Sequence, residues 1–373
     1  MSGAAVGGRR AGASRRIATA VVIASAILIC AGSASSTAAA RPAAARYVAL
    51  GDSYSSGEGN PPFIRGTKGE CDRSNVAYGP LVKRFLKIEQ PSDFSFHACS
   101  GAMMADFVAD LGGHATGQYA EGAQLDQIAP AGKPSLTTRL VTLSVGGNDA
   151  GFAFAVSGCV QVDGIYVSRG TTCAGATDTY ADLGTRLLTR GGRILVTTKD
   201  NSWQFCDAAC ARAHASQKTR ATVVVTVPSL AGLYEDIQRR APNARIRVLL
   251  YPHLFPSMPT TGCLVGTLYL VNPVGFAPAD MVLLNAAADR LDAVIGAQVA
   301  KARSAGVEIA AVDSRPDFAA APGHGLCDGA PWINPVTFTD AWWPTPERGS
   351  FHPTAAGQSA FASELEASLG QNP

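Results

Sequence analysis

The sequence predicts an α/β fold in which helices cover both faces of a parallel sheet. Five short apolar runs have the length of buried strands; they are residues 47–50, 94–98, 140–145, 246–251 and 307–312. Between them lie stretches in which apolar residues recur every three or four positions, most clearly at 230–240 and 281–302, as in amphipathic helices. In such a fold the ligand site lies at the carboxyl ends of the strands.

The first 40 residues have the three parts of a secretory signal peptide. Four arginines, Arg9, Arg10, Arg15 and Arg16, precede an apolar run at 17–31, and small residues ending at 38–40 follow it. The run is shorter than the roughly 20 apolar residues of a membrane-spanning helix, and no later stretch reaches that length. We therefore expect cleavage after residue 40 and secretion of residues 41–373. The arginine pair also leaves the twin-arginine export route open.

Removal of this leader would leave a chain of nearly balanced charge. Residues 1–40 hold four arginines and no acidic residue, so the formal net charge would fall from +2 to about −2. This balance gives no electrostatic reason to bind nucleic acid. The remaining 333 residues suffice for a large core in one domain, with or without an insertion. We expect a monomer.

Eight of the nine cysteines follow the leader, and an even number in an exported chain predicts a disulfide framework. Pairing in sequence order, one of the 105 connectivities that eight cysteines allow, gives Cys71–Cys99, Cys159–Cys173, Cys206–Cys210 and Cys263–Cys327. Cys206 and Cys210 with His214 are an alternative zinc site, but no fourth ligand stands nearby at metal-site spacing. We expect no metal and no cofactor.

The strand and helix pattern weakens between about residues 158 and 218. This part holds four of the eight cysteines, a glycine- and threonine-rich stretch at 170–179 and one possible extra strand at 194–198. It predicts an insertion that is stapled by its own bridges, rather than an independent domain.

Four short motifs stand at junctions where a catalytic site can form. Gly51-Asp52-Ser53 follows the first strand, where a serine can present its hydroxyl and its own N–H to one carbonyl. Ser100-Gly101-Ala102 follows the second strand, and its glycine lets a backbone N–H approach a ligand. Gly147-Asn148-Asp149 follows the third strand and offers a carboxamide donor. Phe351-His352-Pro353 precedes the last helix, and histidine suits proton transfer near neutral pH.

Each motif alone is explained as well by structure: a turn, a loop glycine, a helix cap and a loop histidine. Their fixed order along the chain favours a common site. The four motifs together resemble the SGNH (GDSL) hydrolases, and specifically their secreted actinobacterial lipase and esterase branch. The similarity includes Ser55-Ser56-Gly57 after the nucleophile motif and a stretch at 234–252, and it runs from about 47 to 369 with the insertion as an interruption.

The resemblance implies a flavodoxin-like, three-layer α/β/α sandwich with a five-stranded parallel sheet of order 2-1-3-4-5. It implies Ser53 as nucleophile, His352 as general base, and an oxyanion hole made by the N–H groups of Ser53 and Gly101 and the Asn148 side chain. Three of the four cysteine pairs also match bridges expected in this branch, whereas Cys206–Cys210 does not.

One position departs from the family pattern. Many members have an aspartate three residues before the histidine, where this chain has Gly349. Some members use a backbone carbonyl instead, so a carbonyl of Gly349 or Ser350 is one candidate for orienting His352. The Glu347 carboxylate is the other candidate.

Further aromatic and polar residues near the motifs have two interpretations. Trp342, Trp343 and Phe351 either line an acyl pocket or belong to the core. We expect His253 and His324 to be loop or core residues, and Asp52 to order the turn before Ser53.

The sequence thus predicts a secreted carboxylic ester hydrolase that acts on an ester substrate, a lipid or an acylated small molecule, with transient contact to a lipid surface. Hydrolysis would proceed through an acyl-enzyme on Ser53. Alternatives are a carbohydrate O-acyl esterase, an acyltransferase, and a non-catalytic cell-surface or glycan-binding protein.

Overall fold

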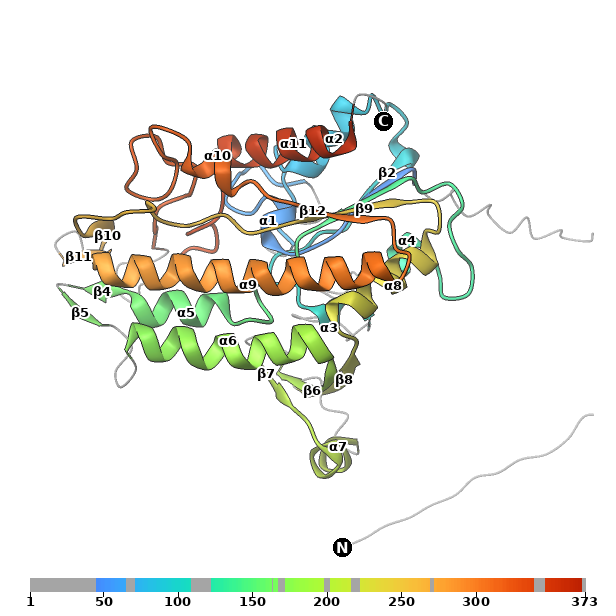
Figure 1. Cartoon of the computed structure of the whole chain (residues 1–373), viewed down its shortest axis with the longest axis horizontal. Coiled ribbons are helices and arrows are strands. Elements are labelled where there is room, and N and C mark those ends of the chain that lie inside the picture. The colour runs from blue at the N-terminus through green and yellow to red at the C-terminus, as the bar shows by residue number, and fades with distance from the viewer. Residues whose placement is uncertain are drawn as a thin grey trace, which may run out of the picture. The chain divides into compact units, whose positions relative to one another are not determined.

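Five parallel strands form the central sheet of the computed structural model, shown in Figure 1. The structure describes residues 45–64, 71–108, 122–162, 164–166, 172–197, 202–215, 222–268, 272–338 and 346–370, all within the compact unit Pro42–Pro373. The predicted signal peptide, Trp342 and Trp343 lie outside these residues. In spatial order the strands are β2 (Phe94–Phe96), β1 (Tyr47–Ala49), β3 (Leu140–Leu143), β9 (Arg245–Leu249) and β12 (Ile309–Val312).

This order confirms the expected 2-1-3-4-5 arrangement, with all neighbours parallel. Tyr47 stands in register with Phe94 on one side and with Leu140 on the other. The sequence extends four of the five strands slightly too far at their carboxyl ends. The reason is that Leu50 and Val145, which follow β1 and β3, stay fully buried after strand pairing has ended.

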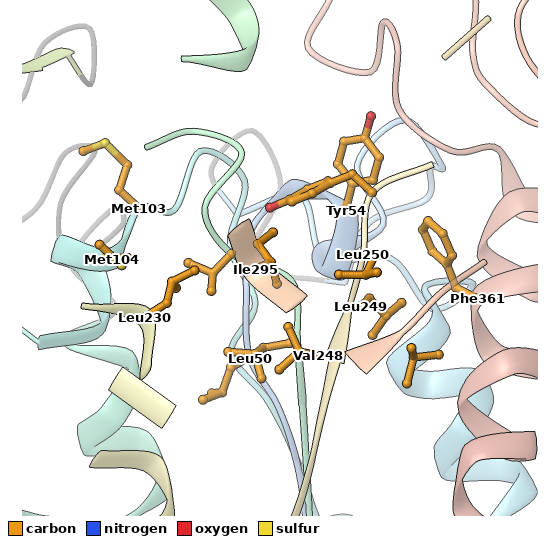
Figure 2. Close-up of a cluster of buried hydrophobic side chains, with 14 of the residues drawn as sticks. Leu50, Tyr54, Met103, Met104, Leu230, Val248, Leu249, Leu250, Ile295 and Phe361 are labelled. Atoms are coloured by element: carbon orange, nitrogen blue, oxygen red, sulfur yellow. The ribbon is translucent and has the colours of Figure 1, made fainter. Parts of the chain in front are cut away.

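Helices cover both faces of this sheet (Figure 1). The layer on one side contains α2 (Tyr78–Phe85) and α11 (Ala355–Leu369), which pack together; the other contains α8 (Leu230–Arg240) and α9 (Pro278–Ser304). Figure 2 shows the consequence for β9: Leu249 lies toward Phe361 of α11, and Ile295 of α9 lies on the opposite side. Because both faces are covered, consecutive strand residues such as Val248 and Leu249 are buried.

Short helices connect the sheet to the loops at its carboxyl edge. These are α1 (Ser53–Ser56), α3 (Met104–Val108), α4 (Gln124–Ile128) and α10 (Arg315–Ala319), while the 3-10 turn Pro91–Asp93 directly precedes β2. No helix among the described residues is both long enough and apolar enough to cross a membrane.

The region of the predicted insertion contains more regular structure than the sequence indicated. It contains α6 (Cys173–Arg190), which packs against α9, and α7 (Ala208–Ala215), while α5 (Phe152–Cys159) leads into it. The strand predicted at 194–198 is β6 (Gly192–Thr197), which pairs with β7 (Ser202–Phe205) and β8 (Thr222–Val227). This small sheet reaches Val227, beyond the boundary predicted at about residue 218. The reason is that β8, which ends at Val227, pairs with β6 along the whole length of both strands.

A second small sheet joins distant parts of the chain. It consists of β4 (Gln161–Val162), β5 (Ile165–Tyr166), β10 (Cys263–Leu268) and β11 (Asn272–Phe276), with β4 paired to β11. Residues 161–162 are therefore joined to residues 272–276 by backbone hydrogen bonds, in addition to the packing of α6 on α9.

The four disulfide bonds are those of the sequence-order pairing: Cys71–Cys99, Cys159–Cys173, Cys206–Cys210 and Cys263–Cys327. Two of them lie within residues 158–218, the range of the predicted insertion. The Cys206–Cys210 bond rules out the alternative zinc site, since thiols joined to each other cannot serve as thiolate ligands.

Candidate active site

Ser53 is the first residue of α1, directly after the turn that ends β1. The turn requires glycine at position 51, which has φ of +122° and where a Cβ would lie 2.6 Å from the Ser144 carbonyl oxygen. The Asp52 side chain caps the helix by accepting the Tyr54 N–H at 3.1 Å. These constraints hold the Ser53 hydroxyl at the carboxyl edge of the sheet.

His352 approaches Ser53 from the loop before α11. Its Nε2 lies 2.8 Å from Ser53 Oγ, and its Nδ1 lies 3.0 Å from the Ser350 carbonyl oxygen. A carbonyl oxygen only accepts hydrogen bonds, so Nδ1 carries the proton and Nε2 is left to accept the Ser53 hydroxyl. The side chain of His352 is 12% exposed. The geometry is that of a serine and histidine pair whose tautomer is fixed by a backbone carbonyl.

The structure separates the two candidates for orienting His352. The Glu347 carboxylate accepts the Thr337 hydroxyl at 2.6 Å on the exposed surface, and the contact with Nδ1 is made by Ser350 instead. The Glu347 alternative is therefore wrong. A backbone N–H to carbonyl bond from Ser350 to Glu347, 3.0 Å long, turns the chain so that the glutamate side chain points elsewhere.

Tyr54 and Phe351 hold the histidine loop in place. Phe351 has φ of +65°, an uncommon conformation for a residue with a Cβ. The Tyr54 hydroxyl donates to the Phe351 carbonyl at 3.0 Å, and the Tyr54 ring lies 5.3 Å from the His352 ring. Phe351 itself is buried against Phe276, so of its two interpretations the core one is correct.

The Gly101 and Asn148 loops are tied to each other beside Ser53. Gly101 has φ of +78°, and the Asn148 Nδ2 donates to the Ala102 carbonyl at 2.9 Å. Because an amide nitrogen has two hydrogens, Asn148 retains a second donor. The buried Asp149 carboxylate accepts the Met104 N–H at 3.1 and 3.2 Å, which joins the same two loops again. Burial raises the pKa of Asp149 to about 7.

A buried polar network lies beneath the turn Gly51-Asp52-Ser53, which we call the nucleophile turn. Asp52 accepts the hydroxyls of Ser144 and Tyr251, and Tyr251 in turn accepts the Gly147 N–H at 3.0 Å. Burial raises the pKa of Asp52, and the hydrogen bonds from Ser144, Tyr251 and the Tyr54 N–H oppose that rise. Asp52 thus orders the turn, as the sequence indicated, and it also connects β1 to the loops after β3 and β9.

Several residues of the site carry no sequence signal that distinguishes them. Gln124 fixes the nucleophile turn from both sides: its Oε1 accepts the Gly51 N–H at 2.8 Å and its Nε2 donates to the Gly51 carbonyl at 2.9 Å. Glu58, inside the motif but without a predicted role, lies 3.7 Å from His352 Nε2. Such pairings depend on loops that meet only in the folded chain.

An apolar cavity of about 90 Å³ opens beside Ser53 and Asn148. It lies between α5, α6, α9 and the loop after β9. Its apolar lining residues include Ala150, Phe152, Ala155, Pro252, Leu254, Leu284, Ala287, Ala288 and Leu291. An apolar cavity with a few convergent polar groups at one end is typical of a site for a small organic group.

The other two histidines of interest have structural contacts. His253 Nε2 lies 2.8 Å from Asp289 Oδ1, and His324 Nδ1 donates to the Ala330 carbonyl at 2.7 Å while its ring stacks on Trp332. Both agree with the expectation of loop or core histidines.

The fold is an α/β/α sandwich with a serine and histidine pair at the carboxyl edge of its sheet, and comparison with known proteins gives the family. Residues 49–360 match the GDSL-like lipase/acylhydrolase family. The chain is 32% identical to Lipase 1 of Streptomyces coelicolor, over 86% of this chain and 85% of the relative. It is also 32% identical to a lipase of Streptomyces rimosus, over 85% of this chain and 83% of that protein.

Solved structures agree with this result. The phospholipase A1 of Streptomyces albidoflavus NA297 superimposes with a TM-score of 0.55 at 27% identity, covering 87% of this chain and 99% of that one. The extracellular lipase of Streptomyces rimosus gives 0.52 at 27% identity with the same coverage. The chain belongs to the GDSL-like lipase/acylhydrolase family and is a carboxylic ester hydrolase.

Proposed function

We propose that this protein hydrolyses acyl lipid esters through a covalent acyl-enzyme on Ser53, with His352 as the general base. The observation that carries the proposal is the contact of 2.8 Å between Ser53 Oγ and His352 Nε2, beside an apolar cavity. A nucleophile, a base in the right tautomer and a site for an apolar group are the parts that acyl transfer requires.

The first step is attack by Ser53 Oγ on the ester carbonyl carbon. As the Oγ–carbon bond forms, the hydroxyl proton moves to His352 Nε2, and the Ser350 carbonyl keeps the ring oriented through Nδ1–H. The proton then passes to the leaving alcohol. In the second step His352 takes a proton from water, which attacks the acyl carbon. As the Oγ–carbon bond breaks and the acid leaves, Nε2 returns that proton to Ser53 Oγ.

The negative charge that develops on the carbonyl oxygen needs donors in a fixed position. We assign this role to the backbone N–H groups of Ser53 and Gly101 and to the second hydrogen of Asn148 Nδ2. The bond from Nδ2 to Ala102 supports the assignment, since it fixes the carboxamide before substrate binds.

The cavity favours an acyl chain over an acetyl group as the part of the substrate that it holds. Most of its lining residues are apolar and many of these come from α5 and α9, while Thr177 and Thr185 of α6 and Arg290 of α9 are polar. The lipase names of the relatives agree with this substrate class. A carbohydrate O-acetyl esterase would use only the space next to Ser53.

We extend the proposal to the cellular location and the oligomeric state of the protein. Four disulfide bonds fit an oxidising compartment, and a relative with 27% identity is extracellular. These facts support secretion by the signal peptide at 1–40. We further propose a monomer that contacts lipid surfaces transiently.

Two measurements test the function. Ser53→Ala should fold like the wild type, lose hydrolysis of nitrophenyl esters, and lose labelling by a fluorophosphonate probe. Labelling that persists in Ser53→Ala would show that another residue is the nucleophile.

The substrate class is tested with Ala288→Phe, which places a ring in the cavity. It should reduce kcat/KM for octanoyl esters far more than for acetyl esters. Equal losses for both esters would refute the acyl-chain assignment.

A further inference from the structure

A second buried carboxylate lies on the far side of the His352 ring from Ser350. Glu58 is 2% exposed, and its Oε2 lies 3.7 Å from His352 Nε2. Its N–H donates to the Ser53 carbonyl at 3.2 Å, so the α1 turn that positions the nucleophile also positions this carboxylate. The group is therefore next to the nitrogen that exchanges a proton with Ser53.

The chemistry of His352 creates a need for such a group. When Ser53 attacks, Nε2 gains a proton and the ring becomes an imidazolium. In a serine, histidine and aspartate triad the aspartate stabilises that positive charge. Here Nδ1 faces a neutral carbonyl, which fixes the tautomer but supplies only a partial charge.

We propose that Glu58 supplies the missing negative charge from the Nε2 side, as a positioning residue that stabilises the imidazolium form of His352 during acyl transfer. This inference rests on the proposed function of Ser53 and His352. Because Nε2 is bonded to Ser53 Oγ at 2.8 Å and the carboxylate stands at 3.7 Å, Glu58 acts through electrostatics and does not compete for the serine proton.

The contacts of Glu58 hold it in this position. Oε2 accepts the hydroxyl of Ser100, and Oε1 lies 3.5 Å from Arg348 Nε. Arg348 is 42% exposed and also lies 3.3 Å from the carboxylate of the buried Asp72. The arginine charge is thus shared between two carboxylates and partly screened by water, so it offsets only part of the field of Glu58 on His352.

A further charged group acts on His352 and has to be distinguished. The Asp52 carboxylate interacts with the ring electrostatically, but its oxygens are engaged by the Tyr54 N–H and by the hydroxyls of Ser144 and Tyr251. Asp52 therefore serves the nucleophile turn, and Glu58 serves the histidine.

Glu58 also links His352 to the loop at 100–102, which holds the proposed oxyanion donor Gly101. Ser100, which donates to Glu58, immediately precedes Gly101, and its own N–H donates to the Cys71 carbonyl at 3.1 Å. Glu58→Gln removes the charge but can keep the hydrogen bond with the Ser100 hydroxyl, because glutamine still has an oxygen that accepts it. The variant therefore separates the effect of the charge from the effect of this bond.

The test compares Glu58→Gln with Glu347→Gln, a matched control that neutralises an exposed glutamate outside the site. Glu58→Gln should lower kcat about 10- to 100-fold, less than the roughly 10⁴-fold loss known for a directly bonded triad acid. KM should stay near that of the wild type, since Glu58 does not line the cavity beside Ser53. Glu347→Gln should keep most of its activity.

Rescue by a conservative variant separates charge from structure. Glu58→Asp retains the charge and should keep at least a tenth of kcat, with a thermal midpoint measured for each variant. If Glu58→Gln does not fold, Glu58→Asp still decides, because a folded aspartate variant as inactive as His352→Ala would overturn the inference. Full activity of a folded Glu58→Gln would overturn it too. If Ser53→Ala retained activity, the proposed function itself would fail.

Discussion

The buried hydroxyl of Tyr251 allows a quantitative test of the network beneath the nucleophile turn. It donates to Asp52 Oδ2 and accepts the Gly147 N–H at 3.0 Å. Burial and the Asp52 carboxylate raise the pKa of Tyr251, so the hydroxyl keeps its proton. Tyr251→Phe removes one oxygen atom and both hydrogen bonds.

The magnitude follows from those two bonds. A hydrogen bond to a charged acceptor contributes about 1.5–3 kcal/mol, and an N–H left buried without a partner costs about 1–3 kcal/mol. We therefore expect Tyr251→Phe to lower the free energy of unfolding by about 3–5 kcal/mol. Part of the loss comes from Asp52, whose buried carboxylate would lose a donor.

The chain offers a matched control in Tyr234 on α8. Its ring is fully buried, and among the described residues no partner stands within hydrogen-bonding distance of its hydroxyl. Tyr234→Phe removes the same atom without breaking a bond, so its effect should be neutral or stabilising.

The assay is denaturant unfolding with disulfides intact, followed by fluorescence and compared at constant m-value. A difference between the two variants below about 0.5 kcal/mol, within the scatter of surface substitutions, would refute the reasoning. The hydroxyl of Tyr251 would then contribute nothing beyond its ring.

Three further predictions concern the oxyanion donor, a titrating core group and the disulfides. Asn148→Ala should lower kcat about 10²–10³-fold with little change in KM, because the donor acts on the developing charge; an effect on KM alone would make Asn148 a substrate contact. Asp149 has a pKa near 7 in the folded protein against an ordinary value of 3.8. Between these two values the native state holds a proton that the unfolded state releases, so the free energy of unfolding falls as pH rises from about 4 to 7. Asp149→Asn should escape this loss, and its free energy of unfolding relative to the wild type should rise across that window by up to about 4 kcal/mol; a pH-independent difference would contradict the assignment. Unreduced native protein should expose no alkylatable thiol among the eight cysteines of the four bonds, by mass spectrometry.

The sequence by itself determined the strands of the sheet and the motifs that lie at its carboxyl edge. The apolar runs at 47–50 and 246–251 identify buried strands because both faces of a covered parallel sheet exclude water, and this requirement is visible in local composition. Ser53, Gly101 and Asn148 were predicted because each follows a strand, and His352 because it precedes the last helix. The order of the four motifs resembles that of a known family.

Some local structure escaped the sequence because local pattern was weak. Helix α6 begins in a glycine- and threonine-rich stretch and is stabilised by packing on α9, far along the chain. Likewise β4 is two residues long and exists as a strand only because β11 pairs with it. Tertiary contacts outweigh propensity in both cases.

Only the tertiary structure decided how the histidine is oriented and which carboxylate lies beside it. Glu347 and Ser350 are both close to His352 in sequence, and the backbone turn between them determines that a carbonyl, not the carboxylate, faces Nδ1. Glu58 lies almost 300 positions away, yet it stands 3.7 Å from Nε2. Distances of this kind are set by the meeting of two loops on a folded sheet, and spacing along the chain carries no information about them.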